Sequence, residues 1–319
     1  MSGWQSSMGK VGELEENLLI VGGGGFIGRN LALNAVKSGY KIVVISLNAP
    51  NTDAIIKSVT YLQADITNFK QLQDRLSDYS FDYIVNLSGY IDHSGFLEGG
   101  NEVIDVHFEG VRNLLKLTNW NRIKRFVQIG SSDEYGNLPA PQTEEMREEA
   151  ISSYSLGKVA STQMLQMLHR TENFPAVILR LFLVFGPGQS DSRFLPQIIQ
   201  GCLSGANFPT SAGDQLRDFC YVDDVSNGIL STLTNDNVNG EVINIASGKP
   251  IAIREVVEMV QKTINFGVPK FGEIPYRKAE NMSLYADVTK SKKLLNWTPK
   301  VSIEDGISRT IQSFTRAKT

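Results

Sequence analysis

The stretch Leu18–Gly28, which reads LLIVGGGGFIG, decides the fold of this chain. It opens with a short apolar run, Leu18–Val21, that has the length of a buried strand and stops at four consecutive glycines. After the glycines, Ile27, Leu31 and Ala35 recur at the spacing of one face of a helix. The stretch therefore predicts a strand, a tight glycine turn and a helix, in that order.

Three of the glycines, Gly22, Gly25 and Gly28, stand three residues apart. Glycine at such positions permits the tight turn, the approach of a pyrophosphate to the backbone, and close packing of helix on strand. The helix that begins near Phe26 and Ile27 presents free N–H groups and the positive end of its dipole to phosphates. Glycine-rich loops are common, but one that lies between the first strand and the first helix predicts a dinucleotide-binding loop. We expect it to consist of Gly22, Gly25, Phe26, Ile27 and Gly28.

Working outward, short β-rich runs alternate with segments of helical period. This alternation is typical of βαβ units and a parallel sheet covered on both faces. The sequence therefore predicts an α/β fold with a Rossmann-type, doubly wound parallel sheet. The expected strands are Leu18–Val21, Lys41–Ile45, Thr60–Gln63, Phe81–Leu87, Phe126–Ile129 and Ala176–Val184, and the expected long helices are Val103–Leu117 and Ser153–His169.

The pattern loosens after about Gly186, where prolines and glycines punctuate the chain. Helical spacing returns only at Ile253–Ile264 and Ile303–Phe314, which indicates a smaller C-terminal α/β lobe that binds substrate. A chain of 319 residues also exceeds what one core usually holds. We expect a dinucleotide-binding domain over 16–186 with returns near 220–246, and a lobe over 187–319.

Composition excludes several classes of function. Apolar residues make up 41% and charged residues 20%, and the net charge is −3 with the signs interspersed, so we expect no nucleic-acid partner. Two cysteines and three histidines without metal-ligand spacing predict a reduced compartment and no protein-held metal. The polar N-terminus does not resemble a signal peptide, and no apolar run is long enough to span a bilayer. We therefore expect a cytoplasmic protein with no membrane partner.

The end of the second strand bears on the choice of cofactor. An acidic residue there would bind the ribose hydroxyls of NAD, but this strand ends in Ser46 followed by Leu47 and Asn48. Without the acid a 2′-phosphate is not repelled, so the sequence favours NADP(H), with NAD(H) as the alternative. We expect Ser46, Asp65 and Ile66 on the adenosine side of the cofactor, although Asp65 equally fits a helix cap.

A catalytic set is indicated by Tyr154 and Lys158, which stand four residues apart on a predicted helix and so share one face. A phenol is a weak base at neutral pH, and a nearby ammonium lowers its pKa toward useful values. Ser131 follows the fifth strand, at the edge of the sheet where ligands bind, and its hydroxyl suits hydrogen bonding to the reacting oxygen. The three side chains fit proton transfer to a sugar oxygen during hydride transfer.

With these residues in place, the chain resembles the extended short-chain dehydrogenase/reductase family, in its nucleotide-sugar epimerase/dehydratase/reductase branch. The resemblance covers Leu18 to about Ile307. Its further motifs are Asn86-Leu87-Ser88-Gly89, Ile129-Gly130-Ser131-Ser132-Asp133-Glu134-Tyr135-Gly136, the segment from Arg180 to Pro187-Gly188, Arg217-Asp218-Phe219-Cys220-Tyr221-Val222-Asp223-Asp224, and Trp297-Thr298-Pro299.

The resemblance implies roles for matching residues. Tyr154 would be the acid/base, Lys158 its partner and also a ligand of the nicotinamide ribose, and Ser131 the catalytic hydroxyl. Leu87 and Ser88 would lie close to the nicotinamide ribose. A nucleoside-diphosphate sugar would be the substrate, bound by Ser132, Arg217 and Arg277, since guanidinium groups suit phosphates.

Departures from the family pattern guide the choice of reaction. Many 4,6-dehydratases carry Asp and Glu directly after the catalytic Thr, and this chain has Ser132 and Asp133 there. The Ser-Ser-acid-acid-Tyr-Gly run is most similar to 4-keto-6-deoxyhexose reductases. Asp133 is a candidate base for epimerisation, or else caps a turn. His107 and Leu183 replace asparagines that are usual in relatives.

The sequence hypothesis is therefore an NADPH-dependent reductase of a nucleotide-activated 4-keto-6-deoxyhexose. The alternatives are a 4-epimerase with retained NAD, a 4,6-dehydratase, and a non-catalytic Rossmann sensor. We also expect a homodimer, which the family commonly forms through helices such as Val103–Leu117 and Ser153–His169.

Overall fold

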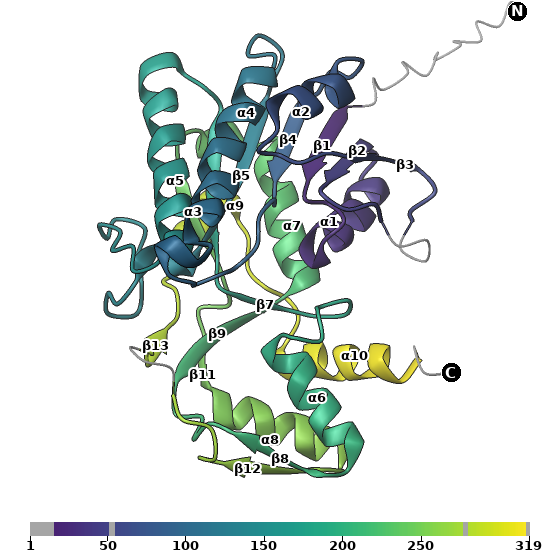
Figure 1. Cartoon of the computed structure of the whole chain (residues 1–319), viewed down its shortest axis with the longest axis vertical. Helices are drawn as coiled ribbons and strands as arrows, with labels where there is room; N and C mark the ends of the chain where they lie inside the picture. The colour runs from purple at the N-terminus through teal and green to yellow at the C-terminus, as the bar shows by residue number, and fades with distance from the viewer. Residues whose placement is uncertain (1–15, 51–54, 277–279, 317–319) are drawn as a thin grey trace, which may run out of the picture.

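A computed structural model describes residues 16–50, 55–276 and 280–316 of the chain. Its larger part is a seven-stranded parallel sheet in the order β10-β6-β5-β4-β1-β2-β3 (Figure 1). The strands are β1 (Asn17–Val21), β2 (Lys41–Ser46), β3 (Val59–Gln63), β4 (Tyr83–Asn86), β5 (Arg125–Ser131), β6 (Ala176–Leu181) and β10 (Val242–Ile245). The crossover between β3 and β4 reverses the strand order beside β1, which places a ligand crevice at the carboxyl ends of β1 and β4.

Both faces of this sheet are covered by helices, because successive side chains of a strand point to opposite faces. Leu18 and Ile20 belong to a core with residues of two helices on one face, and Leu19 and Val21 to a separate core on the other. The first face carries α1 (Phe26–Lys37) and α7 (Val222–Leu233), and the second α2 (Phe69–Leu76), α4 (Gly110–Leu117) and α5 (Ser153–Glu172). The α/β doubly wound prediction is confirmed.

The helix expected over Val103–Leu117 is interrupted. It consists of α3 (Gly100–Ile104), a π-helical turn η3 (Asp105–Glu109) and α4. The carbonyl of His107 accepts a hydrogen bond from the Ser161 hydroxyl of α5. A side-chain donor that occupies a helix carbonyl in this way competes with the regular backbone hydrogen bonds of the helix, which fits the wide π-helical turn at His107.

The strand expected over Ala176–Val184 is divided. β6 ends at Leu181, the partner of Ser131 in the register, and β7 (Leu183–Phe185) then pairs with β9 (Leu216–Tyr221) in another sheet. The pairing partners of this run therefore change at Phe182. The chain leaves the large sheet here and returns to it through α7 and β10.

The smaller lobe is built on a four-stranded sheet in which β11 (Pro250–Ala252) and β13 (Ser283–Leu284) flank β9. β8 (Asn207–Thr210) pairs with β12 (Val268–Phe271). Apolar side chains of α6, α8 and α10 form the core of this lobe with those of β7 and β9. These helices are α6 (Phe194–Ser204), α8 (Ile253–Ile264) and α10 (Ile303–Arg316). The remaining described elements are α9 (Thr289–Leu295) and the short turns η2 (Phe96–Glu98), η4 (Ser132–Tyr135) and η5 (Asp236–Val238).

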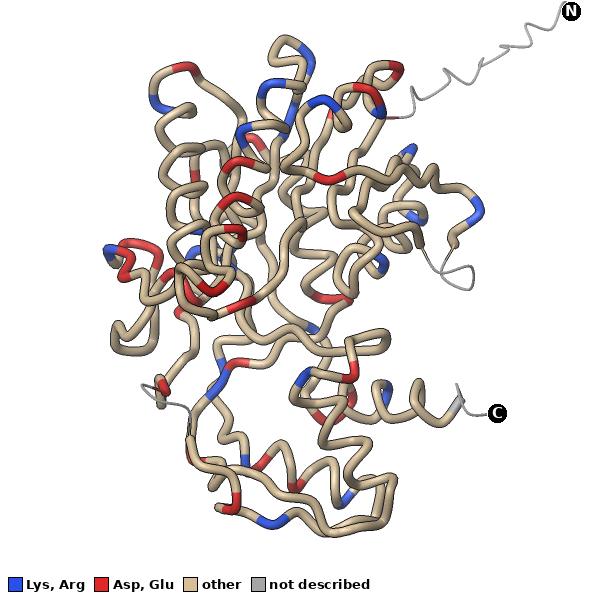
Figure 2. The backbone as a smooth tube through the Cα atoms, in the orientation of Figure 1, with Lys and Arg blue, Asp and Glu red and all other residues tan. Residues whose placement is uncertain are grey.

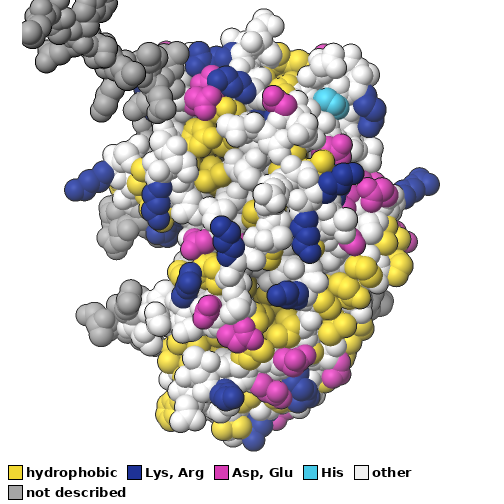
Figure 3. Space-filling view, turned by 180° about the vertical axis from the view of Figure 1, so that it is seen from behind, with side chains coloured by type: hydrophobic (Ala, Val, Ile, Leu, Met, Phe, Trp, Pro, Cys, Tyr) yellow, Lys and Arg dark blue, Asp and Glu magenta, His cyan; other side chains and the backbone are white. Residues whose placement is uncertain are grey.

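Charged residues of both signs are distributed along both parts of the molecule (Figure 2). The opposite face likewise mixes apolar side chains with positive and negative ones (Figure 3). Among the described helices, none has the length and apolar character that a membrane crossing demands.

Candidate active site

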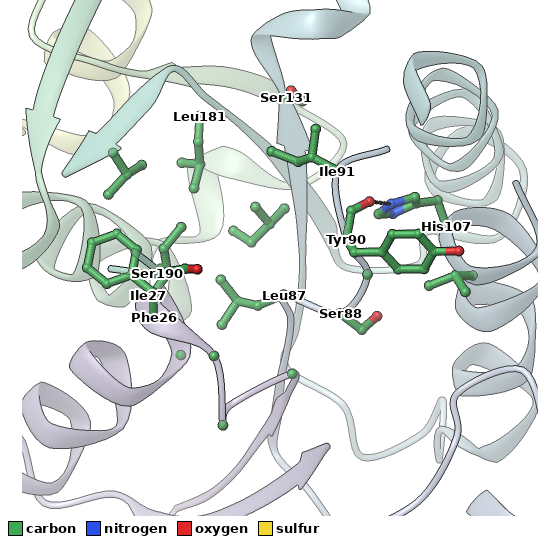
Figure 4. A pocket seen from close by; sticks show the side chains of 18 of the residues that line it. Phe26, Ile27, Leu87, Ser88, Tyr90, Ile91, His107, Ser131, Leu181 and Ser190 are labelled. Atoms are coloured by element: carbon green, nitrogen blue, oxygen red, sulfur yellow. Dashed lines mark hydrogen bonds between the residues drawn. The ribbon is translucent and has the colours of Figure 1, made fainter. Parts of the chain in front are cut away.

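A cavity of about 980 Å³ lies along the carboxyl ends of the large sheet and extends toward the lobe. Phe26 and Ile27 lie on one side of it and Tyr90 and His107 on the other, with Leu87 between them (Figure 4). It is lined by all the residues that the sequence predicts for the cofactor, namely Gly22, Gly25, Phe26, Ile27, Gly28, Ser46, Asp65, Ile66, Leu87, Ser88 and Lys158. This is the crevice in which open α/β sheets bind ligands.

The glycine loop has the form that a pyrophosphate requires. Gly22 has a φ of +76°, and a Cβ there would lie 2.9 Å from the backbone of Leu87. A Cβ on Gly28 would lie 2.5 Å from the Cα of Gly23. Gly25 caps α1 without a side-chain hydrogen bond, and the first turn of α1 contains no acidic residue. The N–H groups and dipole of α1 therefore face the cavity unneutralised, which fits a dinucleotide phosphate.

Among the described residues that line the adenosine end of the cavity, from Ser46 to Ala49 and from Ala64 to Ile66, Asp65 is the charged one. The hydroxyl of Ser46 accepts a hydrogen bond of 2.9 Å from the N–H of Gly24, which ties β2 to the glycine loop. One carboxylate oxygen of Asp65 accepts from the N–H and hydroxyl of Thr67, so it also caps the turn before α2.

Ser131, Tyr154 and Lys158 all line the cavity. Ser131 is the last residue of β5, and Tyr154 and Lys158 lie one turn apart on α5, which is capped by Ser152. The ammonium of Lys158 donates a hydrogen bond of 2.7 Å to the carbonyl of Ile129 and lies 5.9 Å from the centre of the Tyr154 ring. The spacing of four residues thus places both side chains at the end of β5.

Burial shifts the pKa values of Lys158 and Tyr154 in the directions that favour their uncharged forms. Burial lowers the pKa of Lys158 to about 8, with Glu134 and Asp133 acting in the opposite direction. Burial and the charge of Asp133 raise the pKa of Tyr154 above its ordinary value, while hydrogen bonding with Ser131 lowers it. Without a ligand the phenol is therefore protonated at neutral pH, and its activation depends on positive charge brought close to it.

Two histidines flank the Tyr154 ring, and sequence reasoning did not place either of them there. His107 stands edge-on at 5.0 Å between ring centres and His93 at 5.8 Å. The His107 ring bonds to the Tyr90 carbonyl at 3.0 Å, and the His93 ring to the Asp133 carboxylate at 2.9 Å. Burial lowers the pKa of His107 to about 3, with Lys158 adding to the shift, so this ring is neutral.

The predicted substrate residues are not all in the cavity. Ser132 and Asp133 line it, but Arg217 does not, and its guanidinium is paired with Glu280 and with the Leu216 carbonyl. Arg277 lies outside the described residues. Arg193, the residue before α6, also lines the cavity. No motif or periodicity in the sequence points to it, because it stands in a loop.

The fold and these contacts define a Rossmann-type dinucleotide-binding enzyme of the short-chain dehydrogenase/reductase class. The model of the NAD dependent epimerase/dehydratase family matches residues 18–246, and the chain belongs to this family. The chain is 27% identical, over 92% of its length and 94% of the relative's, to a UDP-glucuronate 4-epimerase of Thermodesulfobacterium geofontis.

Two solved structures show the same fold. UDP-glucose 4-epimerase of Thermotoga maritima, with UDP-glucose, superposes with a TM-score of 0.87 at 23% identity, covering 95% of this chain and 100% of that one. dTDP-glucose 4,6-dehydratase of Bacillus anthracis, in complex with NAD, superposes with a TM-score of 0.84 at 23% identity, covering 95% and 97%.

Substitution of two loop glycines should separate packing from phosphate binding. We expect Gly28→Ala to lower the free energy of unfolding by about 1–3 kcal/mol, because its methyl group would overlap the backbone of Gly23. Gly25→Ala finds only an ordinary contact of 3.4 Å with the Gly22 carbonyl oxygen, so its main effect should be weaker NADH binding. Urea unfolding and NADH fluorescence measure the two effects. Equal losses of stability in both variants would contradict this account.

The ionisation of His107 provides a second test. Because burial holds its pKa near 3, we expect its ring to remain uncharged on acidification from pH 8 to about pH 5. The measurement is an NMR pH titration of the imidazole signals, with His107→Asn to assign the signal that disappears. A His107 signal that titrates between pH 5 and pH 7 would show that the ring is accessible to solvent.

Proposed function

We propose that this protein oxidises and re-reduces C4 of a nucleoside-diphosphate sugar with retained NAD, and so inverts C4. The observation that carries the proposal is the placement of Ser131, Tyr154 and Lys158 around one cavity that continues from the glycine loop to Arg193. The similarity to UDP-glucuronate 4-epimerase over most of both chains supports this reaction.

NAD is the cofactor that we propose, although the missing acid after β2 favoured NADP(H). The 2′-phosphate of NADP(H) is usually bound by a cationic side chain. The cations among the described lining residues are Lys158 and Arg193, and both lie beside Tyr154 rather than beside Ser46. Ser46 instead offers its hydroxyl beside the glycine loop. The dehydratase of Bacillus anthracis contains NAD, which agrees with this choice.

Tyr154 would take the proton of the C4 hydroxyl while the hydrogen on C4 leaves as hydride, so that a 4-ketone forms. When bound, an oxidised nicotinamide dinucleotide supplies the hydride acceptor and a positive ring. The Lys158 ammonium stabilises the phenolate form of Tyr154, and the Ser131 hydroxyl holds the sugar oxygen. For the inversion, the hydride would have to return to the other face of C4, and Tyr154 would return its proton to the C4 oxygen.

Arg193 would bind the diphosphate of the substrate. It adjoins the N-terminus of α6, lines the cavity, and its charge acts on Tyr154. A guanidinium presents several donors to phosphate oxygens, and the helix dipole adds to the attraction. Arg217 and Arg277 remain predicted diphosphate ligands, and the homodimer also remains a prediction.

Reduction of a nucleotide-activated 4-keto-6-deoxyhexose is the second candidate. The run Ser131–Gly136 favours it, since SSDEYG is the arrangement that resembles such reductases. The two candidates share Tyr154 and Lys158, but a reductase consumes one reduced cofactor per product and an epimerase consumes none. This difference in stoichiometry separates them.

Purified protein should be incubated with UDP-glucuronate, UDP-glucose and their relatives without added reductant, and the sugar products identified by NMR. We expect a C4 epimer to form, and we expect Tyr154→Phe to slow its formation about 10²–10⁴-fold through loss of acid/base catalysis. Tyr79→Phe, on an exposed turn, is the matched control. Stoichiometric oxidation of NADPH by a 4-keto-6-deoxyhexose, with no epimerisation, would instead establish the reductase.

A further inference from the structure

A buried carboxylate lies directly behind the catalytic serine. Glu134 is the third residue of the turn η4, and its side chain has no exposure to solvent. One carboxylate oxygen accepts the N–H of Ser131 at 2.9 Å. The other accepts the hydroxyl of Thr162 at 2.8 Å and two N–H groups of Arg180 at 3.0 and 3.1 Å. The four donors satisfy the carboxylate, as burial of such a group requires.

These contacts connect two elements of the site. Thr162, Lys158 and Tyr154 are spaced four residues apart on α5, so they share one face of the helix. Glu134 therefore joins the end of β5, at Ser131, to the face of α5 that carries the acid/base and its partner.

We propose that Glu134 is a positioning residue, whose carboxylate fixes Ser131 against α5 and sets the charge environment of Tyr154 and Lys158. The inference rests on the proposed function only in that those three residues carry the chemistry. It concerns a side chain for which neither the motif nor the family resemblance gave a role.

The charge of Glu134 acts on both titrating groups. It raises the pKa of Lys158 against the effect of burial and so maintains the ammonium, and it also raises the pKa of Tyr154. Other ionisable groups act on the same two side chains or on the carboxylate itself. They are Asp133, His107, Arg193, Arg180 and Tyr135. Glu148 acts on the Arg180 guanidinium and not on Tyr154 or Lys158.

Stability alone does not explain a carboxylate in this place. A buried ion pair stabilises a fold little, because desolvation offsets the attraction between the charges. Arg180 has a second carboxylate partner, Glu148, at 2.6 Å, and its guanidinium lies 4.6 Å from the centre of the Tyr135 ring. Glu148 contacts the same guanidinium but not Ser131 or Thr162, so it offers a matched control.

Three variants test the proposal by the pH profile of kcat/KM. Glu134→Gln keeps the volume but removes the charge, so both limbs should move to lower pH and kcat should fall about tenfold or more with little change in KM. Thr162→Val removes one hydrogen bond and no charge, so kcat should fall several-fold without a shift of the profile. Glu148→Gln should leave kcat and profile close to wild type.

Amide hydrogen exchange of the segment 129–135 is the readout that does not need activity. We expect faster exchange at Ser131 in Glu134→Gln and Thr162→Val than in Glu148→Gln, at temperatures where all remain folded. If Glu134→Gln does not fold, Thr162→Val carries the test.

A wild-type rate and pH profile in Glu134→Gln would overturn the inference. If Glu134→Gln does not fold, a wild-type rate in Thr162→Val would overturn it. Effects in Glu148→Gln equal to those in the other variants would also overturn it. A wild-type protein that is inactive on every sugar would overturn the proposed function. Exchange at Ser131 would still decide whether Glu134 holds Ser131 against α5.

Discussion

The close contact between the first turn of α1 and the glycine loop is the constraint on which the site depends. Any side chain at Gly28 would overlap the backbone of Gly23, and one at Gly22 would overlap the backbone of Leu87 and Ser88, directly after β4. The helix can therefore lie directly on the end of β1, with its N–H groups over the crevice where the strand order reverses. The cavity along the ends of β1, β2, β4 and β5 follows from this contact.

The strand and helix pattern was predictable because it depends on short-range periodicity. Leu18–Val21 has side chains buried on both faces, and such runs read directly as strands of a covered parallel sheet. The division at Phe182 was not predictable, because its residues are apolar on both sides and the change of partner from β5 to β9 is a long-range event. The π-helical turn at His107 likewise depends on Ser161, which lies more than fifty residues away.

The site was predictable where its residues have fixed spacing along one element. Tyr154 and Lys158 are one turn apart, so local geometry alone places them together. For Arg217 the motif gave a role but not a position: its guanidinium is paired with Glu280 and does not line the cavity, and its role as a diphosphate ligand remains a prediction. His93 and Arg193 reach the site through loops, and no periodicity relates a loop residue to a distant helix.

In the proposed reaction, the surroundings of Tyr154 make its activation depend on added positive charge. The ring is buried, faces the carboxylates of Asp133 and Glu134, and is flanked by the neutral ring of His107. Burial and the two carboxylates favour the protonated phenol, whereas the hydrogen bond with Ser131 and the charge of Arg193 favour the phenolate. In the proposed reaction, a bound oxidised nicotinamide ring would add positive charge beside the phenol, so that proton transfer by Tyr154 would depend on the presence of the hydride acceptor.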